Sequence, residues 1–223
     1  MQLGRPPQTV LFDLDGTLVD NFDAIALAAN QVFEIMGLPQ QPKATICNSV
    51  GGGALGTMAR LVGEGNAATA TRLYLEHFPS VMLEGVRVYA GARELIKALR
   101  AQGTTVAVLT NKDHTNSLKL LAHLKMDSEL DGIFGTNAVP WRKPDPAFTH
   151  YVLGKLGNRS AAGTEMIGDS PFDIATARQG GLAAARVVAT GTHSLTELAE
   201  YSPDSGHPDL PTLAREAWGM EVG

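Results

Sequence analysis

From residue 89 onward, short apolar runs rich in β-branched residues alternate with stretches of helical periodicity, and no other feature restricts the fold as strongly. The run 104–109 (Thr-Thr-Val-Ala-Val-Leu) is typical of a strand that is buried on both faces. In the range 115–124, Leu118, Leu121 and Leu124 lie three residues apart, which predicts a helix. Such alternation favours parallel strands joined by helical crossovers, so we expect an α/β fold with a Rossmann-like parallel sheet between two helical layers. Further strands are predicted at 9–12, 132–135, 165–167 and 184–188, and further helices at 93–101, at 146–156 and from 174.

One segment interrupts this alternation after the first predicted strand. From Phe22 to Met36, apolar residues recur at steps of three and four, as on one face of a helix. The pattern that follows, from 38 to about 87, is helical and loop-like. We therefore predict a catalytic core formed by 1–20 and 89–223, with an all-helical cap inserted at 21–88. Within the cap, helices are expected at 55–62 and 67–78, and in the core the segment 201–211 is expected to be a loop.

Two aspartates follow the first predicted strand directly, in the segment Asp13-Leu14-Asp15-Gly16-Thr17. In an extended chain, side chains at positions i and i+2 point the same way, so Asp13 and Asp15 can face one site. That site would lie at the carboxyl end of the strand, where open α/β sheets bind their ligands. An ordinary capping turn would explain this pair equally well if the pair stood alone.

Other predicted strands also end in polar residues, which the parallel arrangement would bring to the same edge of the sheet. Thr110-Asn111 follows one strand, and the segment from Gly168 to Asp173 follows another. We expect four carboxylates to converge there: Asp13, Asp15, Asp169 and Asp173. Two unit charges about 4 Å apart repel by about 4 kcal/mol at an effective dielectric constant near 20, so such a cluster needs a cation. Oxygen ligands without Cys or His favour Mg²⁺.

Four segments resemble, in the same order, the four motifs of the haloacid dehalogenase superfamily: Asp13–Thr17, Thr110, Lys143 and Gly168–Asp173. The predicted helical insertion is similar to the small cap of the phosphoglycolate phosphatase-like branch of that superfamily. Thr110-Asn111-Lys112 and the segment 142–146 also resemble this branch. The resemblance implies a Rossmann-like core that carries the chemistry and a helical cap that closes over it.

The resemblance also implies roles for the first two aspartates. Asp13 would be the nucleophile that attacks phosphorus and forms an aspartyl-phosphate. Asp15 would protonate the leaving alkoxide and then activate the water that hydrolyses the intermediate. The dehalogenases of the superfamily lack an acid at the position of Asp15, because a halide leaves without a proton. The chain is therefore expected to act on phosphate rather than on carbon–halogen bonds.

The remaining motif residues would bind the metal and the phosphoryl group, according to the same resemblance. Asp169 would hold Mg²⁺ together with Asp13 and the backbone carbonyl of Asp15. Asp173 would support the metal or orient Lys143. Phosphoryl oxygens would be bound by Thr110 and Lys143, with help from backbone N–H groups near Leu14 and Asn111. In the cap, Arg60 and the loop Gly51–Gly53 are candidates for selecting the substrate, although a solvated surface charge and a plain interhelical loop are the alternatives.

The function expected from this resemblance is a Mg²⁺-dependent phosphatase of small phosphate monoesters, with 2-phosphoglycolate as the first substrate to consider. A phosphomutase of the β-phosphoglucomutase type is an alternative, because it would use the same aspartates but hold its aspartyl-phosphate until a sugar hydroxyl arrives. A non-catalytic phosphate-binding module is a further alternative. The presence of both Asp15 and Lys143 argues against it, since a binding module needs no proton shuttle.

Composition restricts the partners and the location that we expect. Lys and Arg number 18 against 23 Asp and Glu, and no basic cluster offsets this balance, so a nucleic-acid partner is not expected. The longest apolar runs are too short to cross a bilayer, and residues 1–8 lack the apolar core of a signal peptide. Cys47 is the only cysteine, which excludes an internal disulfide. We expect a cytoplasmic protein, a monomer or weak homodimer, whose partner is a small phosphate ester.

Overall fold

The computed structural model describes residues 5–222. Residues 1–4 and 223 of the predicted core lie outside the described residues, and so does the first half of the segment 1–8 that was compared with a signal peptide. Six parallel strands form one sheet in the order β5-β4-β1-β6-β7-β8. The strands are β1 (Thr9–Phe12), β4 (Thr105–Asp113), β5 (Gly132–Thr136), β6 (Thr164–Gly168), β7 (Ala184–Val188) and β8 (Ser205–His207). The helices beside them are α5 (Ala92–Ala101), α6 (His114–His123), α7 (Pro146–Lys155), α8 (Pro171–Gln179), α9 (Leu195–Ala199) and α10 (Leu210–Trp218).

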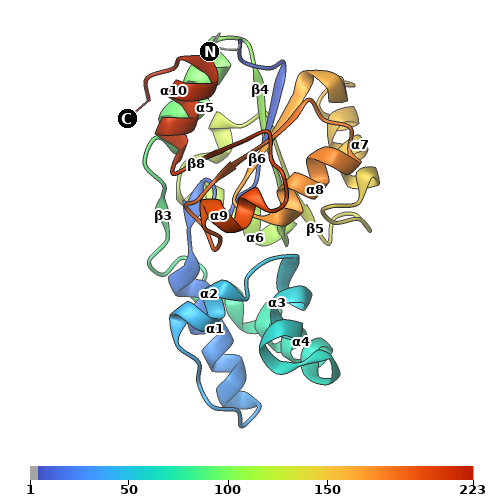
Figure 1. Ribbon diagram of the computed structural model, residues 1–223. Coiled ribbons are helices and arrows are strands. Elements are labelled where there is room, and N and C mark those ends of the chain that lie inside the picture. Colours follow the sequence, from blue (N-terminus) through green and yellow to red (C-terminus); the bar gives the residue numbers. More distant parts are fainter. Residues whose placement is uncertain (1–4, 223) are drawn as a thin grey trace.

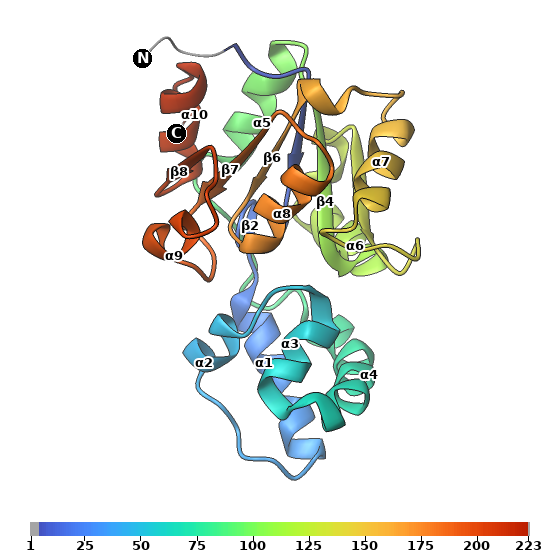
Figure 2. The same cartoon turned by 45° about the vertical axis from the view of Figure 1, so that its right-hand side comes forward.

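The helices cover both faces of this sheet (Figures 1 and 2). The side chains of β1 show the division, because Val10 and Phe12 pack in one apolar cluster and Leu11 packs in another. The first cluster includes buried residues of α5, α6 and α10, and the second includes buried residues of α7, α8 and α9. The predicted Rossmann-like architecture with three layers is confirmed, and strand β1 is buried along its whole length because helices cover both faces of the sheet.

A second group of helices lies between two short strands, β2 (Val19–Asp20) and β3 (Arg87–Val88), which pair antiparallel. Its members are α1 (Phe22–Ile35), α2 (Lys43–Asn48), α3 (Gly53–Val62) and α4 (Glu64–Val81). We call these four helices the helical unit. They pack against one another below the sheet, on the side where the strands β1, β4 and β6 end (Figure 2). The carboxyl edge of the sheet therefore faces the helical unit.

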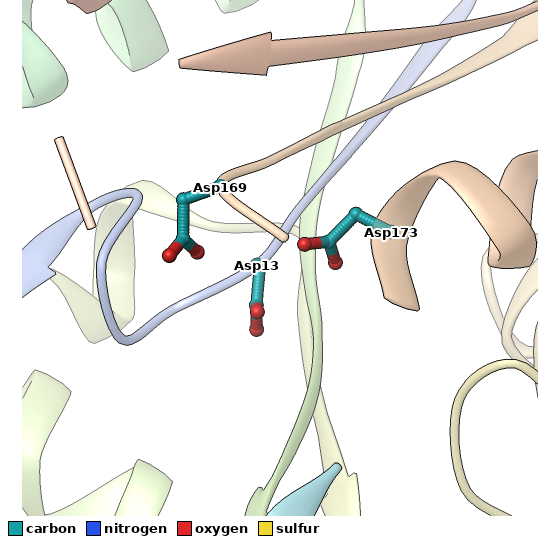
Figure 3. Close-up of side chains that lie close together, drawn as sticks. All are labelled: Asp13, Asp169 and Asp173. Carbon is teal, nitrogen blue, oxygen red and sulfur yellow. The ribbon is translucent and has the colours of Figure 1, made fainter. Parts of the chain in front are cut away.

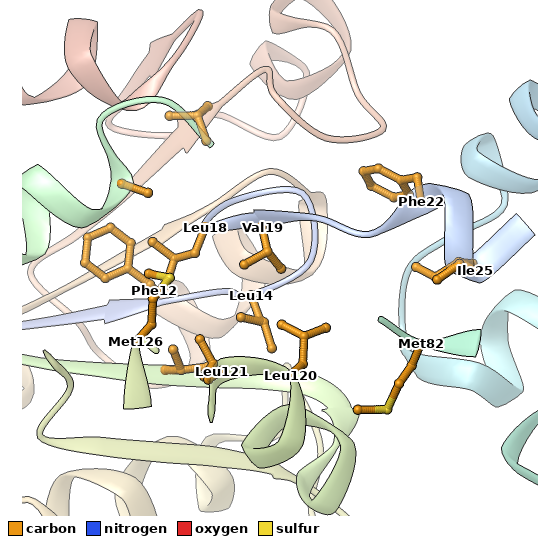
Figure 4. Close-up of a cluster of buried hydrophobic side chains, with 14 of the residues drawn as sticks. Phe12, Leu14, Leu18, Val19, Phe22, Ile25, Met82, Leu120, Leu121 and Met126 are labelled. Atoms are coloured by element: carbon orange, nitrogen blue, oxygen red, sulfur yellow. The ribbon is translucent and has the colours of Figure 1, made fainter. Parts of the chain in front are cut away.

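One apolar cluster joins the helical unit to the core. Phe22 and Ile25 of α1 and Met82 after α4 are buried in the same cluster as Leu14 and Leu18, which follow β1 (Figure 4). Fully burying one such side chain contributes about 1.5–3 kcal/mol, so several of them hold the helical unit firmly against the sheet. No helix within residues 5–222 combines the length and the apolar composition that crossing a bilayer requires.

Strand β8 corrects the prediction that residues 201–211 form a loop. Ser205, Gly206 and His207 pair in parallel with Arg186 to Val188 of β7. None of these three residues is β-branched, so local preference does not favour a strand here. Pairing with β7 provides the hydrogen bonds, and the ring of His207 is held between the Ser205 hydroxyl and the Glu216 carboxylate, at 2.9 Å from each. The strand is thus stabilised by contacts between segments, which a local pattern does not reveal.

Candidate active site

Three aspartates converge at the carboxyl edge of the sheet (Figure 3). Asp13 follows β1 directly, Asp169 follows β6, and Asp173 lies in the first turn of α8. Each of the three offers a carboxylate oxygen, and these oxygens all lie within 4.8 Å of one another. They come together because β1 and β6 are neighbours in register, so their last residues end at the same level of the sheet.

The backbone closes tightly around the carboxylate of Asp169. The Thr17 hydroxyl donates to Oδ1 of Asp169 at 3.2 Å, and the Thr192 N–H donates to Oδ2 at 3.4 Å. A Cβ atom at Gly16 or at Gly191 would overlap this carboxylate. Gly16 also has a φ of +86°, which is a conformation that side chains disfavour. Gly16 therefore permits both the turn after β1 and the close approach of Asp169.

Lys143 supplies the positive charge of this cluster. Its Nζ atom lies 2.9 Å from Oδ2 of Asp13 and 2.7 Å from Oδ1 of Asp173. The other oxygen of Asp173 accepts hydrogen bonds from the N–H and hydroxyl groups of Ser170, which caps α8. Oδ1 of Asp13 accepts from the Leu14 N–H at 2.7 Å. The ammonium group thus lies between two carboxylates whose positions are set by separate elements.

Burial and repulsion raise the pKa of two of the carboxylates. Burial raises the pKa of Asp13 to about 6, an effect that Asp173 increases and Lys143 opposes. Burial, together with repulsion from Asp173 and Asp13, raises the pKa of Asp169 well above its ordinary value. Burial lowers the pKa of Lys143, but attraction to Asp13 and Asp173 outweighs burial and leaves that pKa raised. Three carboxylates around one ammonium group leave a surplus of negative charge on oxygen ligands, so a hard cation such as Mg²⁺ fits this donor set.

Asp15, the fourth carboxylate expected to converge, points elsewhere. Its Oδ2 atom accepts a hydrogen bond from Nζ of Lys112 at 3.0 Å, and its side chain is not a member of the three-carboxylate cluster. Its Oδ1 atom is buried and has no hydrogen-bond partner among the described residues. Lys112 provides a buried cation on this side of the site, which explains why the carboxylate of Asp15 lies apart from the other three.

Lys112 was not among the predicted site residues. The signal for it is the spacing of Thr110 and Lys112, which lie two positions apart and therefore point the same way in an extended strand. Strand β4 continues to Asp113, beyond the end predicted from its apolar run, because Asp113 still pairs with Thr136 of β5. The side chain of Lys112 also reaches the helical unit, where its Nζ atom lies 4.5 Å from the centre of the Phe78 ring of α4.

Thr110 and Asn111, the other predicted residues of the core, both lie near the cluster, but only the side chain of Asn111 is bonded to the Lys143 backbone. Thr110 is buried and lines the pocket, and its hydroxyl accepts a hydrogen bond from the Lys112 N–H at 3.2 Å. The side-chain amide of Asn111 instead bonds the backbone of Lys143, through contacts of 2.7 and 3.0 Å. This amide fixes the segment that carries the lysine, and its role toward a substrate stays a prediction.

A cavity of about 240 Å³ lies between the sheet edge and the helical unit. Asp13, Asp15 and Lys112 line it from the core, and the Gly51–Gly53 loop and Phe78 line it from the helical unit. Its volume is below the range of about 300–1,000 Å³ that is usual for drug-sized ligands, so a small ligand suits it. The two parts of the chain form the site together.

The two predicted substrate-selecting features of the helical unit differ in position: within residues 5–222, the Gly51–Gly53 loop lines the cavity, whereas Arg60 does not. A Cβ atom at Gly52 would lie 2.8 Å from the ring of Phe172, so the loop is pressed against the core. Arg60 does not line the cavity among the described residues. Its guanidinium group donates to the backbone carbonyls of Ser49 and Gly51, the first at 2.9 Å. Arg60 thus supports the glycine loop, and its direct contact with a substrate stays a prediction.

Comparison with known proteins agrees with this geometry. A family model described as haloacid dehalogenase-like hydrolase matches residues 10–187. Phosphoglycolate phosphatase of Rhodospirillum rubrum is 36% identical over 187 residues, which cover 79% of this chain and 77% of the relative. Phosphoglycolate phosphatase of Cereibacter sphaeroides is 32% identical over 214 residues, which cover 92% of this chain and 97% of the relative. A crystal structure from Haemophilus somnus, described as a predicted phosphoglycolate phosphatase, matches with a TM-score of 0.81 and 28% identity, over 91% of this chain and 94% of that one.

Proposed function

The chain belongs to the haloacid dehalogenase-like hydrolase family, and from this premise we propose that it is a Mg²⁺-dependent phosphatase of small phosphate monoesters, with 2-phosphoglycolate as its first substrate. The observation that carries the proposal is the contact of Asp13 with Lys143 at 2.9 Å, in one cavity with Asp15. A carboxylate beside a buried ammonium group is suited to attack phosphorus, because the ammonium group offsets the charge of the incoming phosphoryl oxygens.

In the first step, an oxygen of Asp13 forms a bond to phosphorus while the bond from phosphorus to the ester oxygen breaks. Asp15 gives its proton to the departing oxygen, so the product leaves as a neutral alcohol. Lys143 and the Thr110 hydroxyl bind the phosphoryl oxygens. In the second step, Asp15 takes a proton from water, the water oxygen attacks phosphorus, and the aspartyl-phosphate returns to free Asp13 and inorganic phosphate.

Asp13, Asp169 and the backbone carbonyl of Asp15 would hold Mg²⁺, with Asp173 in support. Their fit rests on the oxygen donors and the surplus of negative charge described above. Bound there, the cation would neutralise phosphoryl oxygens as a Lewis acid. Thr17 and Thr192 keep the Asp169 carboxylate in place for this role through their hydrogen bonds.

Residues 21–88 are the cap of this enzyme. The glycine loop and Phe78 cover the cavity on the side that faces the sheet edge, so they exclude bulk water from the reacting atoms. Phosphoglycolate is the first substrate to test because two relatives, at 36% and 32% identity, carry that activity in their names. The small volume of the cavity agrees with an ester of this size.

The test is phosphate release from a panel of esters with Mg²⁺, with the Asp13→Asn variant as background. The panel contains 2-phosphoglycolate, hexose phosphates, nucleoside monophosphates and pyrophosphate. We expect release that needs both Mg²⁺ and Asp13, with the highest kcat/KM for 2-phosphoglycolate. Equal release by the Asp13→Asn variant would contradict the proposed nucleophile. Transfer of the phosphoryl group to the hydroxyl of an added sugar, with little release of inorganic phosphate, would instead identify a mutase.

A further inference from the structure

Two lysines, Lys143 and Lys112, line the cavity, one beside Asp13 and the other beside Asp15. Lys143 contacts Asp13 and Asp173 on the nucleophile side, whereas Lys112 contacts Asp15 at 3.0 Å on the side of the proposed acid. The side chain of Lys112 is only 7% exposed. A function would explain the burial of this lysine, because removing its charge from water costs several kcal/mol. The mechanism derived above gives Lys112 no task.

The surroundings of Lys112 leave part of its binding capacity free. An ammonium group has three N–H donors. Among the described residues, Nζ of Lys112 makes one hydrogen bond, to Asp15, and lies 4.5 Å from the centre of the Phe78 ring. The adjacent Oδ1 atom of Asp15 is buried without a partner. An unused cationic donor therefore lies beside the carboxylate that would protonate the leaving group.

The wall of the cavity on the side of the helical unit carries no charged side chain among the described residues. Ile25, Met58, Leu75 and Phe78 line it with apolar groups, and Thr57, Thr71 and Tyr74 add neutral hydroxyl groups. A carboxylate that leaves water needs a charged partner, because its desolvation costs more than that of a neutral group. Of the other described cations that line the cavity, Lys143 is occupied by two aspartates, and Arg142 is exposed.

We propose that Lys112 is the specificity-determining residue of this site, and that it binds a carboxylate group on the leaving alcohol. The proposal rests on the proposed phosphatase function and deepens it, since it assigns phosphate esters of small hydroxy acids as the substrate class. In such an ester a carboxylate one carbon from the ester oxygen lies next to the group that Asp15 protonates. Lys112, already 3.0 Å from Asp15, is then within reach of that carboxylate. The ring of Phe78 keeps water from the ammonium group and so strengthens the contact.

A role in positioning alone is the competing explanation, in which Lys112 merely orients Asp15. The two roles differ in what the Lys112→Met variant does. Loss of an orienting contact reduces kcat for every ester by the same factor. Loss of a carboxylate-binding contact reduces kcat/KM much more for an acidic leaving group than for a neutral one.

The experiment compares 2-phosphoglycolate with 2-hydroxyethyl phosphate, which replaces the carboxylate by a neutral hydroxymethyl group. In Lys112→Met, we expect the preference for 2-phosphoglycolate to fall by about ten- to a hundredfold, the range of a charge-assisted hydrogen bond. Lys112→Arg should recover part of the preference. The matched control is Lys119→Met, which removes a charge from an exposed position of α6 and should keep the wild-type preference. An equal loss for both esters, or a preference that Arg142→Met abolishes and Lys112→Met does not, would overturn the proposal.

A second measurement separates this proposal from the proposed function. Calorimetric titration with 3-phosphonopropionate and with propylphosphonate compares two phosphonates that differ in the carboxylate, and the P–C bond of each resists ester hydrolysis. If the wild type hydrolyses neither of the two esters compared above nor any ester of the earlier panel, the phosphatase proposal fails, and the titration alone decides on Lys112. Tighter binding of 3-phosphonopropionate that Lys112→Met removes would support the assignment. Equal binding of both ligands by the wild type would overturn it.

Discussion

The Nζ atom of Lys143 lies 2.7 Å from Oδ1 of Asp173, and both side chains are 1% exposed. Removing one partner of a buried pair leaves the other charge without compensation. We therefore expect Lys143→Met to lower the free energy of unfolding by about 3–5 kcal/mol. Urea denaturation in EDTA measures this change without a contribution from metal. Lys119→Met is the control, and a loss below about 1 kcal/mol in Lys143→Met would contradict the importance of the pair.

The carboxylate cluster predicts stabilisation by Mg²⁺. At a concentration near 100 times its Kd, the cation should raise the free energy of unfolding by about 2.7 kcal/mol. Asp169→Asn should lose most of this gain, because burial and repulsion from Asp173 and Asp13 raise the pKa of this carboxyl and a bound cation would relieve both effects. The control is Asp127→Asn, at an exposed position. A thermal scan with and without Mg²⁺ would contradict the assignment if Asp169→Asn kept the full wild-type shift.

Gly52 and Gly37 form a matched pair of glycines in the helical unit. Their φ values are +69° and +66°, so alanine at either position costs about 1–2 kcal/mol of backbone strain. A Cβ atom at Gly52 would also meet the Phe172 ring at 2.8 Å, whereas nothing lies within 4 Å at Gly37. We expect both substitutions to lower stability, and only Gly52→Ala to lower kcat/KM, because it lifts the loop from the core.

Removing the clash should undo this effect. Phe172→Leu combined with Gly52→Ala is expected to recover part of the lost kcat/KM, since the smaller side chain leaves room for the added methyl group. Equal kcat/KM values for Gly37→Ala and Gly52→Ala would show that contact of the glycine loop with Phe172 does not matter for the reaction.

His207 predicts a loss of stability in mild acid. Burial lowers its pKa from the ordinary value of 6.5, although Glu216 opposes the shift. The unfolded chain then binds a proton more readily than the folded one, so the free energy of unfolding falls as pH drops below about 6.5. His207→Gln should show a shallower decline between pH 7.5 and pH 5.5 in urea denaturation. His150→Gln, at an exposed position, should keep the wild-type slope, and an unchanged slope in His207→Gln would contradict the argument.

The sequence pattern predicts the acidic cluster because its aspartates lie directly after predicted strands or in the turn that follows them. Asp13 and Asp169 each follow an apolar run that ends at a definite residue, and neighbouring parallel strands bring such ends together. The separation of Asp15 from the other carboxylates could not be predicted in this way. It depends on Lys112, whose place depends on how far β4 continues beside β5. Strand β8 escaped prediction for the same reason, since its pairing with β7 is not encoded in its own composition.

The side-chain contacts of Arg60 and Asn111 also could not be predicted from the sequence pattern. Both residues were predicted to bind substrate, Arg60 from its place in the cap and Asn111 with the backbone N–H groups near it, and these roles stay predictions. In the structure, both donate to backbone carbonyls, Arg60 to the loop that it supports and Asn111 to the segment of Lys143. A polar side chain close to a site often satisfies a backbone group instead, and only the folded arrangement shows which carbonyls are within reach.

Strand β1 lies inside the sheet, paired with β4 on one side and β6 on the other, and its four residues are buried. Backbone amides in such a strand exchange their hydrogens with solvent only when a large part of the protein opens. Asp13 is anchored to the end of this strand, and its own N–H donates to the Ile167 carbonyl at 2.9 Å. We therefore expect the Asp13 carboxylate to stay in place when smaller parts of the molecule open locally. The floor of the site would then keep its shape while such openings occur elsewhere.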